Sequence, residues 1–65
     1  MKLIVNGAAE EAEATNLAAL LRALDYGDAI VATALNGVFV PIRKREETPV
    51  DEGDRIEILA PRQGG

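Results

Sequence analysis

The chain has 65 residues, a net charge of −4, and neither cysteine nor histidine. A chain of this length forms one domain with a small core. The missing residue types exclude disulfides, thiolate nucleophiles, Cys/His zinc sites and catalysis by a histidine base. Hydrophobic residues make up 48% of the chain, which is too many for a disordered segment. The acidic balance would repel phosphate backbones, so it favours a basic partner surface over nucleic acid.

The first elements predicted are two strands joined by a tight turn. Residues 2–6 are mostly apolar and β-branched, and Asn6-Gly7 suits the positive φ values of a two-residue type I′ turn. A short second strand is expected at residues 9–14, where three glutamates indicate a solvated edge. The start lacks a signal-peptide pattern, and no apolar run approaches the roughly 18 residues of a membrane helix. We therefore expect a cytoplasmic protein that does not bind a membrane.

One helix follows. Four leucines recur at the i, i+3, i+4 and i+7 spacing of a single apolar helix face, namely Leu17, Leu20, Leu21 and Leu24. Thr15 is the expected N-cap, and Gly27 is the expected left-handed C-cap. The pattern therefore predicts a helix over about residues 16–26.

A second hairpin is predicted after the helix. Residues 30–35 form a strand, Asn36-Gly37 turns the chain back, and residues 38–40 pair with that strand. Residues 42–54 mix charged residues with proline and glycine, which indicates a loop with room for a short helical turn.

The last predicted strand, residues 55–60, alternates between two faces. Ile56 and Ile58 are assigned to the core, which leaves Leu59 on the opposite face. There Phe39, from the preceding hairpin, could join Leu59 in an exposed apolar patch for docking a partner. The first and last strands could pair at the centre of the sheet. The expected fold class is α+β, a mixed sheet of four to five strands packed on one main helix.

Two charged clusters in the loop are weak candidates for binding sites. Arg43-Lys44-Arg45 is followed by two glutamates, so a solvated loop is favoured over a phosphate site. Asp51, Glu52 and Asp54 lack the 12-residue loop and closing glutamate of a calcium site, so a turn is favoured. The sequence therefore predicts no metal site in the chain.

The sequence ends in Gly64-Gly65, which is the most informative feature for function. Glycines add no side-chain contacts, but they allow a backbone to thread a narrow channel in another protein. A terminal carboxylate is a poor electrophile, so chemistry there needs activation, for instance as an acyl-adenylate. We expect residues 1–61 to form the domain and residues 62–65 to form a flexible tail.

Taken together, these features identify a family. The chain resembles the ubiquitin-like sulfur carriers of the β-grasp fold, related to ubiquitin and to the small subunit of molybdopterin synthase, and most closely the ThiS-type carriers of thiamine biosynthesis. The resemblance covers the full length of the chain. It rests on these features: the opening strand with Asn6, the Leu20-Leu21 helix, Leu35-Asn36-Gly37 running into Val40-Pro41, Glu52-Gly53-Asp54, and Gly64-Gly65.

The resemblance implies a carrier that is a substrate of other enzymes and not itself an enzyme. A ThiF-like adenylating enzyme would use ATP to convert the Gly65 carboxylate to an acyl-adenylate, and a sulfur donor would then yield a thiocarboxylate. A thiazole synthase would accept the sulfur. The chain itself would bind no cofactor. Gly64, Gln63 and Arg62 would be recognised with the terminus, although Arg62 and Gln63 differ from the apolar residues often found there.

Three alternatives stay open. A molybdopterin-type carrier fits the last strand and the tail, although the compact loop between Pro41 and Val50 favours the ThiS type. A non-covalent ubiquitin-like interaction module would make the glycines incidental. A very small enzyme is the third alternative, but a single small sheet offers no cleft to desolvate a catalytic pair.

Overall fold

The computed structural model of the protein describes residues 1–60; the predicted tail and its boundary after residue 61 lie outside the described residues. The elements follow the predicted order, with a short 3-10 helix in the long loop. They are β1 (Lys2–Val5), β2 (Ala8–Glu11), α1 (Leu17–Ala23), β3 (Ala32–Leu35), β4 (Val38–Val40), η1 (Ile42–Glu47) and β5 (Arg55–Leu59).

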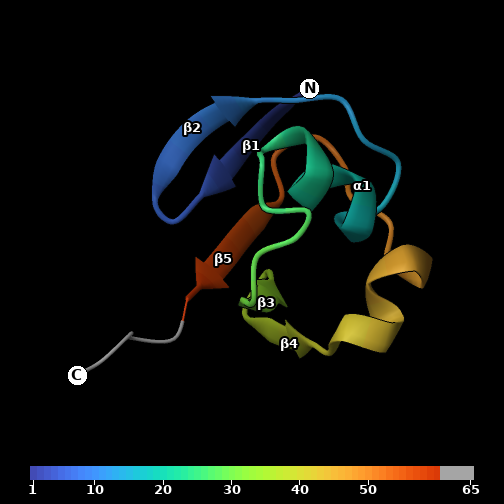
Figure 1. Ribbon diagram of the computed structural model, residues 1–65. Coiled ribbons are helices and arrows are strands. Elements are labelled where there is room, and N and C mark those ends of the chain that lie inside the picture. Colours follow the sequence, from blue (N-terminus) through green and yellow to red (C-terminus); the bar gives the residue numbers. More distant parts are fainter. Residues whose placement is uncertain (61–65) are drawn as a thin grey trace.

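The five strands form one mixed sheet in the order β2-β1-β5-β3-β4. The first strand, β1, pairs in parallel with the last strand, β5, while the other neighbours are antiparallel. As predicted, these two strands lie at the centre of the sheet, and α1 covers one face (Figure 1). This arrangement confirms the α+β class and the β-grasp architecture expected from the sequence.

The core lies between α1 and the covered face of the sheet. Leu17, Leu20 and Leu21 of α1 are buried, and Leu24 packs against them while partly buried. In β5, Ile56 and Ile58 are buried and Leu59 is exposed, which confirms the predicted alternation. The remaining buried apolar residues are Leu3, Val5, Val31, Val40 and Val50.

Both Asn-Gly turns have the predicted backbone conformation. Asn6 and Asn36 each have a φ of 51°, and the following Gly7 and Gly37 have φ values of 83° and 85°. Positive φ at both central residues is the signature of the type I′ turn, whose twist matches that of the flanking strands.

Two strands are two residues shorter than predicted because each loses its pairing partner, and β1 and β5 are each one residue shorter. β2 ends at Glu11, which pairs with Lys2, the first residue of β1, so the strand does not continue to residue 14. β3 begins at Ala32, opposite Leu59, where β5 ends. Every residue of β2 is exposed, as expected for a solvated edge strand.

The helix ends differ from the sequence prediction. The N-cap is Asn16, not Thr15: its Oδ1 accepts a hydrogen bond from the Ala19 backbone N–H at 2.8 Å. At the other end the left-handed residue is Asp25, with a φ of 68°, and not Gly27. The Asp25 and Tyr26 N–H groups donate back into the last turn, to the carbonyls of Arg22 and Leu21. This Schellman arrangement satisfies the final carbonyls and stops the helix before Gly27 can cap it.

An aspartate in the left-handed region carries a backbone strain that glycine does not. We therefore expect Asp25→Gly to stabilise the protein by about 0.5 kcal/mol. Asp28→Gly is a matched control, because it removes the same charge at a nearby exposed position outside the left-handed region. That change should destabilise by about 0.5 kcal/mol, since glycine only adds freedom to the unfolded chain. Urea unfolding of both variants measures the difference, and equal effects would contradict this account of the cap.

Candidate functional site

The strand that leads to the predicted tail, β5, is held in the middle of the sheet by a side chain from the first turn. The ladder between β1 and β5 ends with Val5 opposite Ile56. Beyond it, the Asn6 Oδ1 accepts from the Ile58 N–H at 2.8 Å, and the Asn6 Nδ2 donates to the Ile58 carbonyl at 3.2 Å. The carboxamide thus replaces the missing strand and occupies backbone groups that would otherwise face an open edge.

The other turn asparagine holds the beginning of the same strand. Asn36 donates its backbone N–H to the Arg55 carbonyl at 2.7 Å, and its Oδ1 accepts from the Arg55 N–H at 2.9 Å. Its Nδ2 donates to the Asp54 carboxylate. Sequence reasoning used both asparagines only as turn residues, but they also fix the strand that precedes the candidate site.

The predicted site residues of the tail are Arg62, Gln63, Gly64 and Gly65, and all four lie outside the described residues. The described chain ends at Ala60, one residue beyond β5. In Figure 1, β5 runs through the middle of the sheet and ends at the periphery of the molecule. The structure therefore provides a fixed starting point for the segment that carries them.

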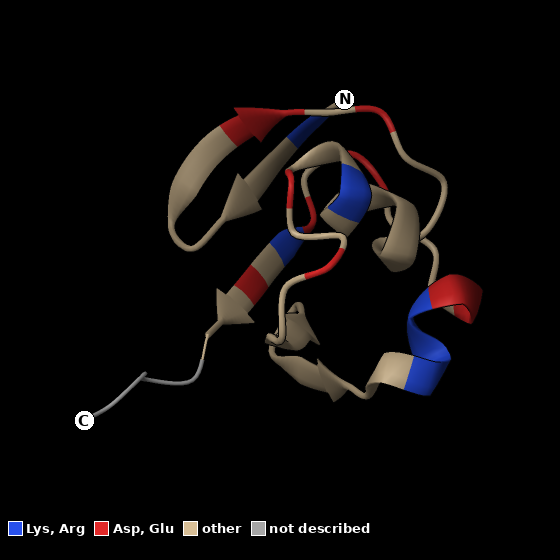
Figure 2. Cartoon of the chain, viewed as in Figure 1, with Lys and Arg blue, Asp and Glu red and all other residues tan. Residues whose placement is uncertain are grey.

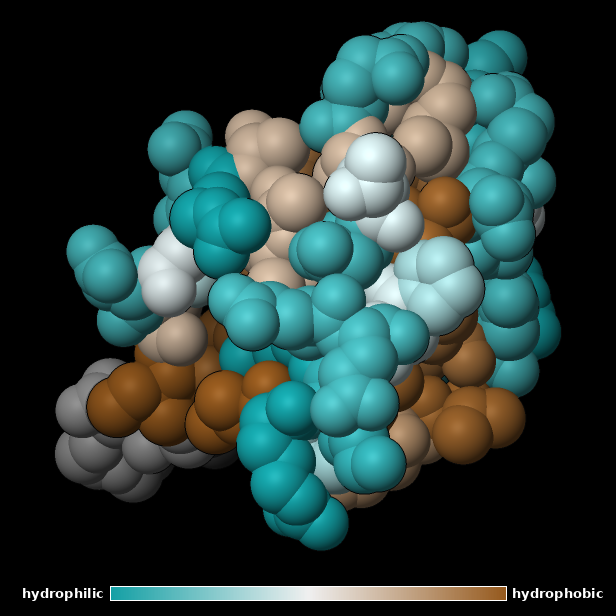
Figure 3. All heavy atoms as spheres, turned by 90° about the vertical axis from the view of Figure 1, so that its right-hand side faces the viewer, coloured by the Kyte–Doolittle hydropathy of each residue, from teal (hydrophilic) through white to brown (hydrophobic). Residues whose placement is uncertain are grey.

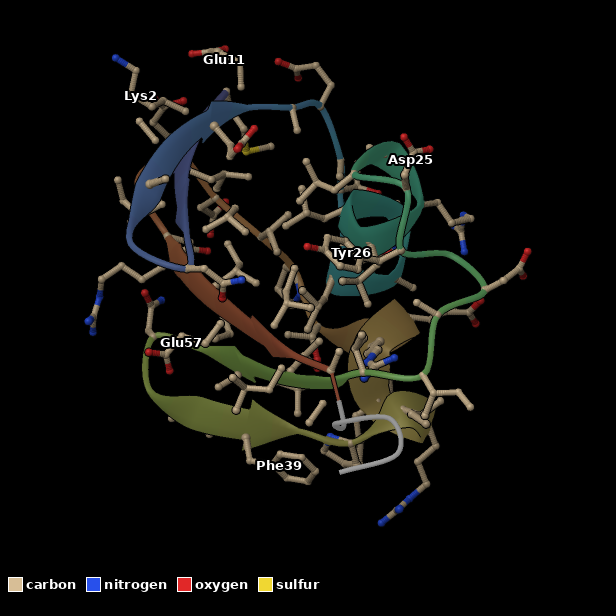
Figure 4. All side chains as sticks on the ribbon, turned by 60° about the vertical axis from the view of Figure 1, so that its left-hand side comes forward. Lys2, Glu11, Asp25, Tyr26, Phe39 and Glu57 are labelled. Carbon is tan, nitrogen blue, oxygen red and sulfur yellow. The ribbon has the colours of Figure 1, made fainter. Side chains whose placement is uncertain are left out.

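The two predicted docking residues lie on the sheet face opposite α1. Phe39 is 65% exposed and Leu59 is 68% exposed. Phe39 pairs with Ala34, and Leu59 pairs with Ala32. Figure 4 shows Phe39 projecting from β4 away from the helix.

Phe39 and Leu59 belong to one surface but do not touch. They lie two strands and two residues apart, which corresponds to about 12 Å between the strand positions. The space between them is occupied by the alanines of β3. Ala32 lines a hollow with Leu59 and a second hollow with Phe39. The predicted patch is therefore a shallow apolar shelf with a large side chain at each end.

The acidic residues near the start of β5 stabilise the fold and do not surround this shelf. The Asp54 carboxylate accepts from the Asp51 N–H at 2.8 Å, and the Glu52 carboxylate accepts from the Lys2 N–H. They lie at the opposite end of β5 from Ala60, about 20 Å along the strand. Only Glu57 projects on the shelf side (Figure 4).

The turn assignment for these acidic residues agrees with the structure. Gly53, with a φ of 85°, lies in a turn closed by the Asp54 N–H and the Asp51 carbonyl. Within residues 1–60, no group of three acidic side chains is placed to hold a metal ion.

The chain matches the ThiS family over residues 3–65. The chain belongs to the ThiS family. Among solved structures it is similar to the thiamine biosynthesis protein ThiS from Geobacter metallireducens, with 33% sequence identity and a TM-score of 0.84. The match covers 100% of both chains. Comparison with curated proteins gives no match.

Membership of the ThiS family confirms the resemblance and the fold expected from the sequence. No helix within residues 1–60 is long and apolar enough to cross a membrane.

The sequence interpretation of one basic residue of this ThiS-family chain was wrong. Arg45 is not on a solvated loop but is only 9% exposed, packed between η1 and β3. Its Nε donates to the Thr33 hydroxyl at 3.1 Å, and one Nη donates to the Val31 carbonyl at 2.6 Å. The Thr33 hydroxyl in turn donates to the Val40 carbonyl. Arg45 therefore joins η1 to the beginning of β3 through hydrogen bonds to neutral acceptors.

The neighbours of Arg45 differ in their environment. Arg43 and Lys44 are exposed, as expected for a solvated loop. Figure 2 shows the basic stretch of η1 followed by its two glutamates, with a further basic residue on α1. Arg43 shares a hollow with Arg45 and with Arg22 of α1, whereas Lys44 lines a different one. Local sequence could not distinguish these three positions.

Proposed function

We propose that this protein is a sulfur carrier of thiamine biosynthesis, and that the sulfur is carried on the C-terminal carboxylate of Gly65. The observation that supports the proposal most strongly is the ThiS-family match, which extends through residue 65. The structure of residues 1–60 is consistent with it, because the architecture that it shares with the Geobacter metallireducens protein holds β5 in the middle of the sheet as a fixed base for the following residues.

The chemistry follows from the low reactivity of a carboxylate. A carboxylate oxygen of Gly65 attacks the α-phosphorus of ATP, and pyrophosphate leaves. A sulfur nucleophile then attacks the acyl carbon and AMP leaves, so one carboxylate oxygen departs with the AMP and a thiocarboxylate remains. Glycine suits this step because it leaves both faces of the carbonyl open.

The catalytic groups belong to partner enzymes in this proposal. A ThiF-like adenylating enzyme binds ATP and activates the terminus, and a sulfur donor supplies the sulfur. A thiazole synthase accepts the sulfur for thiazole formation. Gly64, Gln63 and Arg62 enter the partner with the terminus. The carrier supplies the surface that these enzymes recognise and the terminal segment that they modify. It binds no cofactor itself and works in the cytoplasm with these enzymes.

Intact mass spectrometry tests the proposal. The protein is incubated with a ThiF-like enzyme and ATP, and then with a sulfide source. We expect first an AMP adduct and then the exchange of one oxygen for sulfur. Fragmentation should locate both changes at Gly65. An unchanged mass under conditions that modify an established ThiS protein would reject the carrier mechanism.

A non-covalent interaction module is the second candidate, and the exposed shelf at Phe39 and Leu59 favours a docking role in either case. The mass experiment separates the two functions, because a module would bind partners without any change in mass. A molybdopterin-type carrier would be modified at the same atom, but would pass sulfur to a different acceptor, so transfer to a thiazole synthase distinguishes it.

The shelf provides a prediction for partner docking. Leu59→Ser should weaken binding to the adenylating enzyme by about tenfold, because a leucine side chain that becomes buried on binding contributes more than about 1 kcal/mol. Stability should change little, since Leu59 is mostly exposed. Val38→Ser is the matched control: Val38 is 67% exposed but lies on the other face of the sheet. Isothermal titration calorimetry measures the affinity of both variants for the adenylating enzyme, and equal affinities would exclude the shelf as a docking surface.

A further inference from the structure

Three adjoining hollows run around the end of the sheet, from β5 to η1. The first lies between Leu59 and the residues before β3, and it shares Val31 and Ala32 with the second. The second shares Ile42, Arg43 and Arg45 with the third. Because each hollow shares lining residues with the next, the three adjoin, and we call them together the β5–η1 groove.

The part of the groove near β5 is apolar. Ile30 and Leu59 border its first hollow, and Phe39 and Ile42 border the second. These four side chains are among the most exposed large apolar residues of the protein. On the face shown in Figure 3, apolar residues gather in a patch at the lower left of the view and hydrophilic residues border it. Such a surface is suited to burial against another molecule.

The far end of the groove is basic. Arg43 of η1 and Arg22 of α1 line its last hollow together with Arg45. Glu46 lines the same hollow, but within residues 1–60 the ion pairs are those of the N-terminal amine, and none involves these arginines. Three arginines thus line one hollow in a protein whose net charge is −4. The basic end is a local exception to the acidic surface.

Arg45 makes this end more than a solvated charge cluster. Its side chain is nine-tenths buried, and the acceptors described above are neutral. A desolvated cation without a counter-charge is costly, and a carboxylate that reaches the guanidinium gains a charge-assisted hydrogen bond. Arg43 and Arg22 are exposed and can close on the same carboxylate from the solvent side.

We propose that the β5–η1 groove docks an extended segment of the adenylating partner, with an apolar side chain near Ala32 and a carboxylate among the arginines. This inference rests on the proposed function and extends the shelf, whose Ala32, Phe39 and Leu59 line the apolar part of the groove, by a basic contact at η1. The apolar stretch favours a protein segment over a free phosphate, because a phosphate would use only the basic end. The groove begins beside Ala60, so a segment bound in it fixes the carrier next to the start of its tail.

Affinity for the ThiF-like enzyme, measured by calorimetry on full-length chains, tests the inference. Arg43→Glu should weaken binding by about tenfold or more, because it replaces attraction with repulsion at a desolvated carboxylate. Lys44→Glu is the matched control, since it makes the same charge change one residue away but outside the groove. It should change affinity less than about twofold, as expected for a rim charge. Arg43→Lys should retain most of the affinity.

The outcomes separate this inference from the proposed function. If the wild-type protein is adenylated but Arg43→Glu binds as Lys44→Glu does, the carrier function stands and the groove contact is wrong. If the wild-type protein is not adenylated, both fall. Arg22→Glu is a second variant at the same end and should also weaken binding. A last outcome combines two results: inorganic phosphate alone protects the side-chain N–H groups of Arg43 and Arg45 from hydrogen exchange with water, and Arg43→Glu leaves the affinity for the partner unchanged. The basic end would then be an anion site, and the proposal would be overturned.

Discussion

Deleting Gly65 is expected to abolish adenylation by a ThiF-like enzyme while leaving the domain folded. The reacting carboxylate would move to Gly64, one residue short of the position that the partner must reach, and a misplacement of this size is enough to stop a positioned reaction. The core and the contacts of Asn6 and Asn36 with β5 are made within residues 1–60. Stability should therefore change by less than about 0.5 kcal/mol, the range for changes away from structural features.

Two measurements are needed. Intact mass spectrometry after incubation with the enzyme and ATP detects adenylation, and a thermal unfolding curve measures stability. Gln63→Ala is the control, because it alters a tail side chain but retains both glycines and the chain length. It should still be adenylated, with at most a reduced rate. A truncated protein that accepts AMP as the intact chain does would show that Gly65 is not the site of activation.

The fold was predictable because its elements are encoded by local patterns. The leucine spacing of α1 and the alternation around Ile56 and Ile58 each report which side faces the core. The Asn-Gly pairs specify both hairpins through their positive φ values. Even the central pairing of β1 with β5 followed from these elements, because one helix and two hairpins left those strands available.

The errors arose where distant residues decide the outcome. Arg45 lies in a stretch of charged residues, and nothing local indicates burial; its acceptors are 12 and 14 residues away. The Asn6 carboxamide bonds to a residue 52 positions later, which only the central position of β5 makes accessible. One error was local instead: the helix ended early because Asp25, a less common residue in the left-handed region than glycine, formed the Schellman motif.

These errors bear on the candidate site more than on the fold. The sequence predicts the chemistry at Gly65 and suggests Phe39 and Leu59 for docking, since terminal glycines and the alternation of apolar residues are local features of the sequence. It could not show that Ala32 lies between the two docking residues, because this depends on the register of three strands. The basic end of the groove depends on η1 packing beside α1, which no local pattern reports.

Leu20→Ala is expected to have the largest effect on stability. Leu20 is fully buried between α1 and the sheet, in contact with the core of a small domain. Removing the side chain loses its transfer free energy and leaves a cavity, which together cost about 2 to 5 kcal/mol. Small proteins have only about 5 to 15 kcal/mol of stability, so the variant should lose a large fraction of it.

The control for this change is Ala23→Ser, at an exposed position on the opposite side of α1. Serine has a lower helix propensity than alanine, so a cost of about 0.5 kcal/mol is expected without any change in packing. Urea denaturation of both variants compares the two faces directly. Equal losses of unfolding free energy would mean that substitutions on every side of the helix destabilise the protein, contrary to the burial of its leucine face. A cost for Leu20→Ala below that of Ala23→Ser would contradict the position of α1 over the sheet, and with it the core on which β5 depends.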